Sequence, residues 1–149
     1  MQKIFNSISE VSMRVLLLLD NIDDPISLER ITILDFFATF GKDFGFSDKN
    51  LHGDGHLNMS EFSARNNIIR KTIVPLQQNH FIIIDGSMLG ITYSISKEGR
   101  HLCGCSTMDY GKEYRIELEK VLKQTHKLTD DEIFHLLQKK ILNKIRGNK

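Results

Sequence analysis

Several features that decide the class of a protein are scarce in these 149 residues. Only two cysteines occur, Cys103 and Cys105, so neither a disulfide framework nor a zinc site made of cysteine alone can be built. The longest aliphatic run, Val15 to Leu19, is far shorter than the roughly 20 apolar residues of a membrane span. The formal net charge of +1 creates no global field toward nucleic acid or membrane. Because residues 1–7 also lack the features of a signal peptide, we expect a cytoplasmic protein without membrane contact.

Motifs of common enzyme classes are missing as well. The sequence has no G-x-x-x-x-G-K-[ST] loop, no G-x-S-x-G elbow and no H-E-x-x-H helix. His52 and His56 are four residues apart, but they lie in a glycine-rich loop where that spacing does not place them on one helical face. His135 lies among apolar residues of the last helix and is expected at or near the core. We therefore expect no catalytic activity and no cofactor.

The stretch from Asn50 to Phe62 is similar to the calcium loop of an EF-hand. Positions 1, 3, 5, 6, 8 and 12 of that loop align with Asn50, His52, Asp54, Gly55, Leu57 and Glu61. Calcium prefers six to eight oxygen ligands, yet the early positions supply one carboxylate together with an amide and an imidazole. We expect instead a connection that ends in a helix cap at Ser60. Calcium sensing remains an alternative that depends on Asp54.

The cysteines permit a second metal hypothesis. His101 lies close to Cys103 and Cys105 in the sequence, so a site with two cysteine and two histidine ligands is conceivable. Free cysteine is commonly buried as a small apolar residue. We expect two reduced cysteines at the edge of a core.

Helical patterns occupy most of the chain. Ser7 and Glu10 form a capping box for a first helix, which ends in residues 21–25. Ser27 caps a second helix that is apolar on most sides and ends at Gly41. A third helix begins at Ser60 or just before it, and Pro75 predicts a kink or an early stop, with the last turn reaching residues 78–79.

A β-hairpin follows these three helices. Residues 81–85 and 91–96 form its strands, and the second strand alternates apolar and hydroxyl side chains. Ser96 caps a short turn or helix, and two helices close the chain, the last with Thr129 and Glu132 as its capping box. The fold class is therefore α+β and mostly helical: a winged helix-turn-helix with two further C-terminal helices. We expect one domain, with a winged-helix core over residues 1–103 and a packed helical extension over 104–149.

A winged helix either reads DNA or joins proteins. Residues 41–59 separate the second and third helices, whereas a DNA-reading helix-turn-helix uses a turn of three or four residues. Basic and amide side chains nevertheless mark two candidate surfaces for nucleic-acid or partner contact. They are Arg65, Asn66, Arg70 and Lys71 on the outer face of the third helix, and Lys139, Lys140, Lys144 and Arg146 in the C-terminal tail. The simpler interpretation of both surfaces is a solvated helix face.

An ordered set of short segments resembles a known family. The segments are Phe5-Asn6-Ser7, Glu10-Val11, Arg14, the leucine run ending at Asp20, Leu28 to Ile31, Leu34 to Phe37, Gly41 to Gly45, Leu51-His52, Asn58 to Arg65, and Gly90 to Tyr93. Together they cover about residues 4–145 and resemble the second type of middle component in ABC-three-component systems. The chain differs where the family is more basic, since Ala64, Arg65 and Asn66 stand there.

The resemblance implies a non-catalytic adaptor. Such chains are small winged-helix proteins, similar to the accessory subunit of Lamassu-type antiphage systems. The implied partners are an SMC- or Rad50-like ABC ATPase and an effector nuclease subunit, with DNA contacted through the complex. The adaptor would restrain the effector until the ATPase engages foreign DNA. The alternative from the residues is a sequence-specific DNA-binding regulator.

Overall fold

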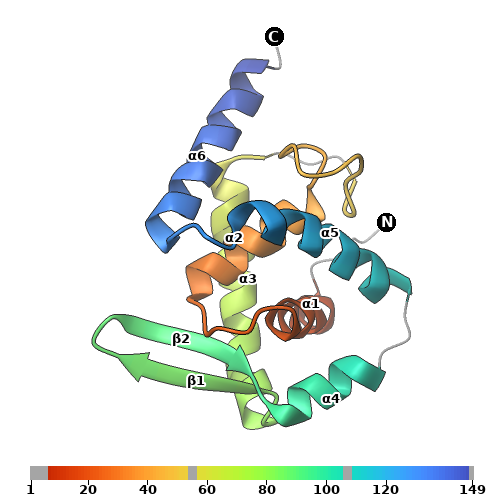
Figure 1. Ribbon diagram of the computed structural model, residues 1–149, viewed down its shortest axis with the longest axis vertical. Coiled ribbons are helices and arrows are strands. Elements are labelled where there is room, and N and C mark those ends of the chain that lie inside the picture. The colour runs from red at the N-terminus through yellow and green to blue at the C-terminus, as the bar shows by residue number, and fades with distance from the viewer. Residues whose placement is uncertain (1–6, 54–56, 106–108, 148–149) are drawn as a thin grey trace.

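The computed structural model describes residues 7–53, 57–105 and 109–147, which hold six helices and one two-stranded antiparallel sheet (Figure 1). In chain order the elements are α1 (Ile8–Asp20), α2 (Leu28–Thr39), α3 (Met59–Gln78), β1 (Ile82–Ser87), β2 (Gly90–Ile95), α4 (Lys97–Cys105), α5 (Asp109–Thr125) and α6 (Asp130–Gly147). The predicted α+β class, with three helices before a hairpin and two helices at the end, is confirmed. The short element predicted after Ser96 is the helix α4.

Helix α2 is the centre of the molecule because it is apolar on nearly every side. All residues from Arg30 to Thr39 are buried, as the sequence predicts for a central helix. α1, α3, α5 and α6 all pack against it (Figure 1). Ser27 caps its start as predicted, since the Ser27 hydroxyl accepts a hydrogen bond from the backbone N–H of Arg30 at 3.1 Å. Any polar side chain on α2 must therefore find its partners inside the protein.

The start of α3 differs from the prediction. The predicted cap at Ser60 is wrong, because the Asn58 side chain accepts a hydrogen bond from the backbone N–H of Glu61 at 2.8 Å and caps the helix. Asparagine and serine serve equally well in this role, so the sequence alone does not choose between them. Pro75 lies inside α3 without stopping it early, and the helix ends at Gln78 as predicted.

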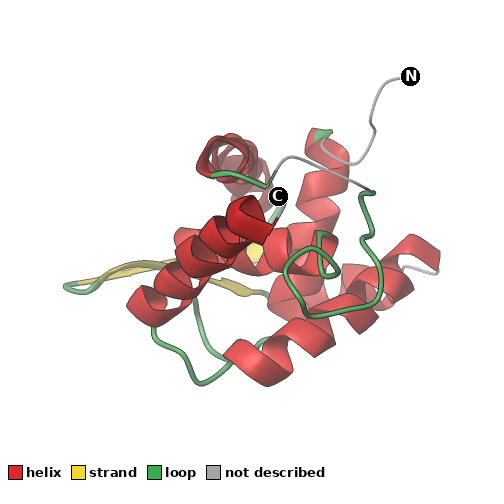
Figure 2. Ribbon diagram, turned by 90° about the horizontal axis from the view of Figure 1, so that it is seen from above, coloured by secondary structure: helices red, strands yellow, loops and turns green. Residues whose placement is uncertain are grey.

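The hairpin is a regular two-stranded ribbon. β1 and β2 pair along their whole length without a bulge. Met88 and Leu89 form the turn, and Gly90 follows with φ of 125°, a conformation that favours glycine. Figures 1 and 2 both show the hairpin projecting from the helical body. We call the hairpin, residues 82–95, the wing.

Helix α4 packs directly on the base of the wing. A side chain at Gly99 would overlap the carbonyl oxygen of Phe81 and the side chain of Ile95, so glycine permits this close approach. The Ser96 hydroxyl accepts a hydrogen bond from the backbone N–H of Gly99 at 3.0 Å and caps the helix as predicted. Helix α4 thereby fixes the base of the wing to the body.

The C-terminal helices cover α2. The Thr129–Glu132 capping box of α6 is confirmed, with reciprocal hydrogen bonds of 3.1 Å to the Thr129 hydroxyl and 2.8 Å to the Glu132 carboxylate. Near the end of α6, the apolar spacing from Ile133 through Ile141 predicts an inward place for Ile145, but this residue is 59% exposed, so that prediction is wrong. The cause is visible in Figure 1, where the end of α6 extends beyond the body. The division into residues 1–103 and 104–149 stays a prediction.

Candidate functional site

A cluster of charged side chains is buried where four helices meet. Asp35 of α2 is 2% exposed and accepts hydrogen bonds from Arg14 of α1 at 2.9 Å, Arg65 of α3 at 2.9 Å and the Tyr114 hydroxyl of α5 at 2.7 Å. Arg65 also donates to the Thr39 hydroxyl at 2.6 Å. One carboxylate thus holds α1, α2, α3 and α5 together. We call these five residues the core charge cluster.

Two guanidinium groups share this one carboxylate, and the pKa values follow from that imbalance. Burial alone would raise the pKa of Asp35, but the charges of Arg14 and Arg65 hold it well below its usual range. Burial depresses the pKa of Arg14, yet Asp35 more than offsets this and the pKa is raised. For Arg65 burial dominates, and its pKa is lowered. Burial and the neighbouring Asp35 charge raise the pKa of Tyr114 well above its ordinary value. These directions favour an ionised Asp35 and Arg14 and a neutral Tyr114 inside the protein.

Arg65 does not lie on the outer face predicted for it on α3. It is 6% exposed, and its guanidinium lies over the rings of Phe36 and Phe40 at 5.2 and 5.4 Å from their centres. Its predicted place on the outer face is therefore wrong. The reason is its spacing, because Arg65 is three residues after Phe62 and four before Ile69, both on the inner stripe.

The other predicted residues of α3 are more accessible. Asn66 is half-buried and accepts a hydrogen bond from the Thr32 hydroxyl at 2.7 Å, so it links α3 to α2. Arg70 and Lys71 are exposed. Two basic residues of this surface thus remain open to a partner.

The basic tail on α6 is partly used within the protein. The Lys140 ammonium donates to the carbonyl oxygen of Phe44 at 2.7 Å and lies 4.6 Å from the centre of the Phe46 ring. Lys144 pairs with Asp43 at 3.4 Å. These contacts hold the connection after α2 against α6. Among the four predicted tail residues, Lys139 and Arg146 are exposed.

The stretch similar to a calcium loop makes other contacts. The Asn50 side chain accepts a hydrogen bond from the backbone N–H of Asp43 at 3.1 Å and donates to the Asp43 carboxylate at 3.0 Å. The His52 ring lies 2.7 Å from the Tyr110 hydroxyl. Asp54, Gly55 and His56 lie outside the described residues. Within the described ranges, histidine, cysteine and acidic side chains form no group of three that could hold a metal ion.

The cysteines differ from one another. Cys103 is buried, and burial with the nearby Asp20 charge raises the pKa of its thiol to about 11. Cys105 is exposed, and its sulfur lies 3.7 Å from Nε2 of His101. His135 is exposed as well, so its predicted place at or near the core is wrong.

A pocket of about 750 Å³ lies between the α1–α2 connection, β2 and the adjoining ends of α5 and α6. An ion pair of 3.1 Å between Arg30 and Asp130 forms part of its wall. The Ser27 hydroxyl donates to Asp130 at 2.8 Å while it caps α2. This hydroxyl therefore links the start of α2 to the start of α6.

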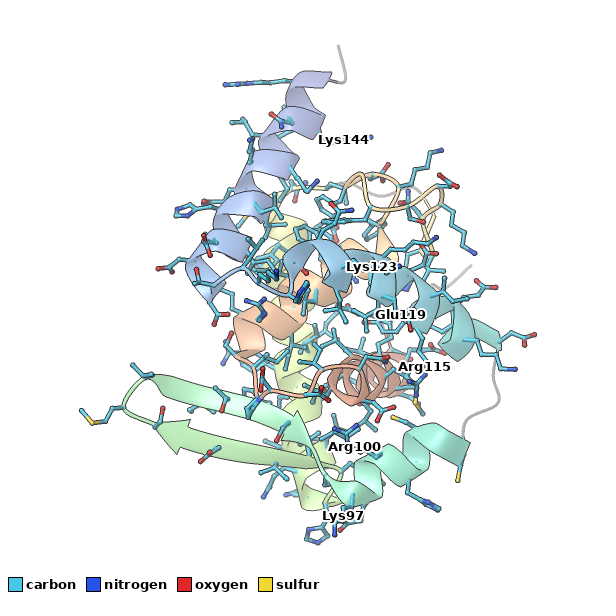
Figure 3. All side chains as sticks on the ribbon, viewed as in Figure 1. Lys97, Arg100, Arg115, Glu119, Lys123 and Lys144 are labelled. Atoms are coloured by element: carbon cyan, nitrogen blue, oxygen red, sulfur yellow. The ribbon has the colours of Figure 1, made fainter. Side chains whose placement is uncertain are left out.

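Five of the eleven large apolar side chains that are exposed among the described residues lie on the wing. Met88 and Leu89 at its tip are fully exposed, and Ile83, Ile84 and Ile91 are between 42% and 56% exposed. Residues 82–95 include one charged side chain, Asp85, and no lysine or arginine. The charged residues labelled in Figure 3 lie instead on α4, α5 and α6. A wing of this composition offers an apolar contact and no cation for phosphate.

A comparison with known families decides the identity of the chain. The family model for the ABC-three component (ABC-3C) system Middle Component 2 matches residues 4–146. The chain belongs to this family. Searches of curated proteins and of solved structures each gave no significant match. As a middle component, the chain is one part of a system with further components, consistent with an accessory subunit of a defence system.

Sequence patterns did not single out Asp35 or Arg14 of the middle component as candidate site residues. Asp35 lies between Leu34 and Phe36 in a helix apolar on most sides, and this setting was the available signal of burial. Arg14 lies similarly on the buried side of α1. In the part of the middle component that the structure describes, no helix combines the length and apolar character needed to cross a membrane.

Proposed function

We propose that this chain is a non-catalytic adaptor in a Lamassu-type antiphage complex, in the cytoplasm. It binds an SMC- or Rad50-like ABC ATPase and an effector nuclease, and it restrains the nuclease until the ATPase engages foreign DNA. Family membership supports a role beside other components. The observation that carries the proposal is the projecting wing, whose tip residues Met88 and Leu89 are fully exposed.

An exposed apolar tip favours a protein partner over DNA. Large apolar side chains in water cost free energy until a partner covers them, and clustered examples mark interaction sites. A DNA-contacting wing instead needs donors or cations for phosphate oxygens. The wing has hydroxyl side chains but its one charge, Asp85, is negative and repels phosphate.

The test is co-expression of the chain with the products of its neighbouring genes. Size-exclusion chromatography of the wild type should give one complex that contains the ATPase. Changing both Met88 and Leu89 to Asp should remove the chain from that complex, since burying two carboxylates in an apolar interface is costly. Ile116→Asp is the matched control, because Ile116 is also an exposed apolar residue, at 54%, and belongs to α5 rather than to the wing.

The outcomes separate the alternatives. A wild-type chain that never co-elutes with an ATPase would contradict the adaptor role. Duplex DNA binding by the isolated chain at low salt, lost on raising the salt and in the double variant Arg70→Ala/Lys71→Ala, would favour the regulator instead. Arg65→Ala does not serve this test, because Arg65 is buried in the core charge cluster.

A further inference from the structure

The two edges of the wing are unequal. On the β2 side, Ile26 forms an antiparallel bridge with Tyr93, with backbone hydrogen bonds of 3.0 and 2.8 Å that use both the N–H and the carbonyl of Tyr93. On the β1 side, no backbone hydrogen bond joins Ile84 or Gly86 to another described residue across the outer edge. The α1–α2 connection therefore occupies the β2 edge at Tyr93, whereas the β1 edge has no such backbone partner among the described residues (Figure 1).

The register shows which groups that open edge presents. In an antiparallel pair, residues whose N–H and carbonyl point outward lie opposite one another. Tyr93 points its backbone groups outward to Ile26, and its partner in the hairpin is Ile84. Ile84 therefore directs its N–H and carbonyl away from β2. Two residues further along the strand, Gly86 does the same.

Apart from the charge of Asp85, this edge lacks the usual protection against strand pairing. Natural sheets protect exposed edges with proline, lysine, a bulge or a covering segment. β1 contains no proline or lysine, its pairing with β2 is free of bulges, and residues 83–87 are exposed. Such an edge is a template for another strand.

The side chains beside the edge restrict what that strand can be. Ile84 shares its face of the sheet with Ile91 and Tyr93, so this face is apolar and extends from the core outward. Asp85 lies on the other face opposite Thr92 and forms no ion pair within the described ranges. An incoming strand matches this edge when it has apolar residues beside Ile84 and a lysine or arginine beside Asp85.

We propose that the outer edge of β1 receives an extended strand from a partner protein, which adds a third strand to the wing. The strand is apolar on the Ile84 face and carries a basic residue next to Asp85. This inference rests on the proposed adaptor function and specifies how the wing makes its contact. Backbone hydrogen bonds to Ile84 and Gly86 provide affinity, and the alternating side chains provide specificity.

A pair of proline substitutions tests the proposal. Ile84 and Ile91 are isoleucines on the same face, 42% and 56% exposed, and both have outward N–H groups that the hairpin ladder does not use. Ile84→Pro removes a donor from the open edge, while Ile91→Pro removes one from the β2 edge. Titration of the purified partner with each variant should show binding weakened about tenfold or more by Ile84→Pro and little changed by Ile91→Pro.

Two further variants guard against misfolding and side-chain effects. Ile84→Thr keeps the N–H and a β-branched side chain, so it should bind better than Ile84→Pro. Asp85→Lys should weaken binding by reversing the one charge on the wing. Circular dichroism must show that each variant keeps the wild-type melting curve. If Ile84→Pro does not keep it, the binding of Asp85→Lys and Ile84→Thr to the partner tests strand addition instead.

The other results would overturn strand addition. Equal effects of the two prolines would indicate an apolar contact without backbone pairing, and a stronger effect of Ile91→Pro would place the partner on β2. A dimer of the isolated chain in light scattering, abolished by Ile84→Pro, would make a second copy the occupant. If a stable complex with the ATPase forms but tolerates Ile84→Pro and Asp85→Lys, strand addition fails while the adaptor function stands. If the wild type forms no complex, the proposed function itself fails.

Discussion

The core charge cluster and the wing reverse the usual distribution of polarity. The cluster places two guanidinium groups and a carboxylate at 6% exposure or less in the middle of four helices. The wing places Met88 and Leu89 wholly in water. In these two regions charge lies inside and apolar surface lies outside, opposite to the general tendency of folded proteins.

The contrast separates what the isolated chain needs from what a complex needs. A buried ion-pair network is weak evidence for stability, but losing one member leaves an uncompensated charge in the interior. The cluster therefore penalises any arrangement in which its four helices fail to meet. Residues 83–91 of the wing are exposed and bury little surface against the body, so we expect them to matter for a complex more than for the stability of the isolated chain.

The largest effect is expected from Asp35→Asn. This change leaves Arg14 and Arg65 buried without a counter-charge and should lower the free energy of unfolding by about 3–5 kcal/mol in urea denaturation. The control is the triple variant Arg14→Met/Asp35→Leu/Arg65→Met, which removes all three charges and should be near wild type or more stable. A loss below about 1 kcal/mol for Asp35→Asn would show that the cluster does not join the helices as described.

A smaller loss is expected from Tyr114→Phe. The Tyr114 hydroxyl donates to the ionised Asp35 at 2.7 Å, and a hydrogen bond to a charged group contributes about 1.5–3 kcal/mol. Tyr93→Phe on β2 is the matched control, with an expected change within about 0.5 kcal/mol. Chemical denaturation followed by circular dichroism compares the two, and equal losses would contradict a special role for the buried hydroxyl.

Acid should weaken the interior through the same carboxylate. The pKa of Asp35 is lower in the folded chain than its unfolded value of about 3.9, so its stabilising contribution is complete above that pH. Below it the unfolded chain binds a proton first, and stability falls by at most about 1.4 kcal/mol per pH unit from this group. Urea titrations from pH 5 to pH 2 should show a shallower fall for the triple apolar variant. Parallel curves would assign the acid sensitivity to other carboxyl groups.

The smallest effect on stability is expected at the wing tip. Changing Met88 and Leu89 to Ser should alter the free energy of unfolding by no more than about 0.5 kcal/mol, because both side chains are fully exposed. Thermal unfolding of the isolated chain measures this directly. A loss above about 1.5 kcal/mol would mean that the tip packs on the body in solution, and the comparison between the two regions would fail.

Sequence reasoning succeeded where local pattern decides the structure. The hairpin followed from the alternation in residues 91–96, and the caps at Ser7, Ser27 and Ser96 followed from short-range spacing. These signals depend on residues a few positions apart. Element order could therefore be read from the chain before any long-range contact was known.

The core charge cluster could not be read in the same way. Arg14 and Asp35 are 21 residues apart, and Tyr114 is 79 residues from Asp35, so their pairing depends on how the helices meet. Arg65 was assigned to the outer face on its charge, although its spacing from Phe62 and Ile69 placed it on the inner one. For this chain, helical period was the better guide to burial than residue polarity.

The Ile26–Tyr93 bridge has a consequence for stoichiometry. Sheets with two free edges can recruit strands on both sides and propagate into open-ended assemblies. In the wing, the bridge occupies the β2 edge at Tyr93 with the chain's own backbone. The bridge therefore disfavours a second added strand on the β2 side, which favours a discrete particle over a filament.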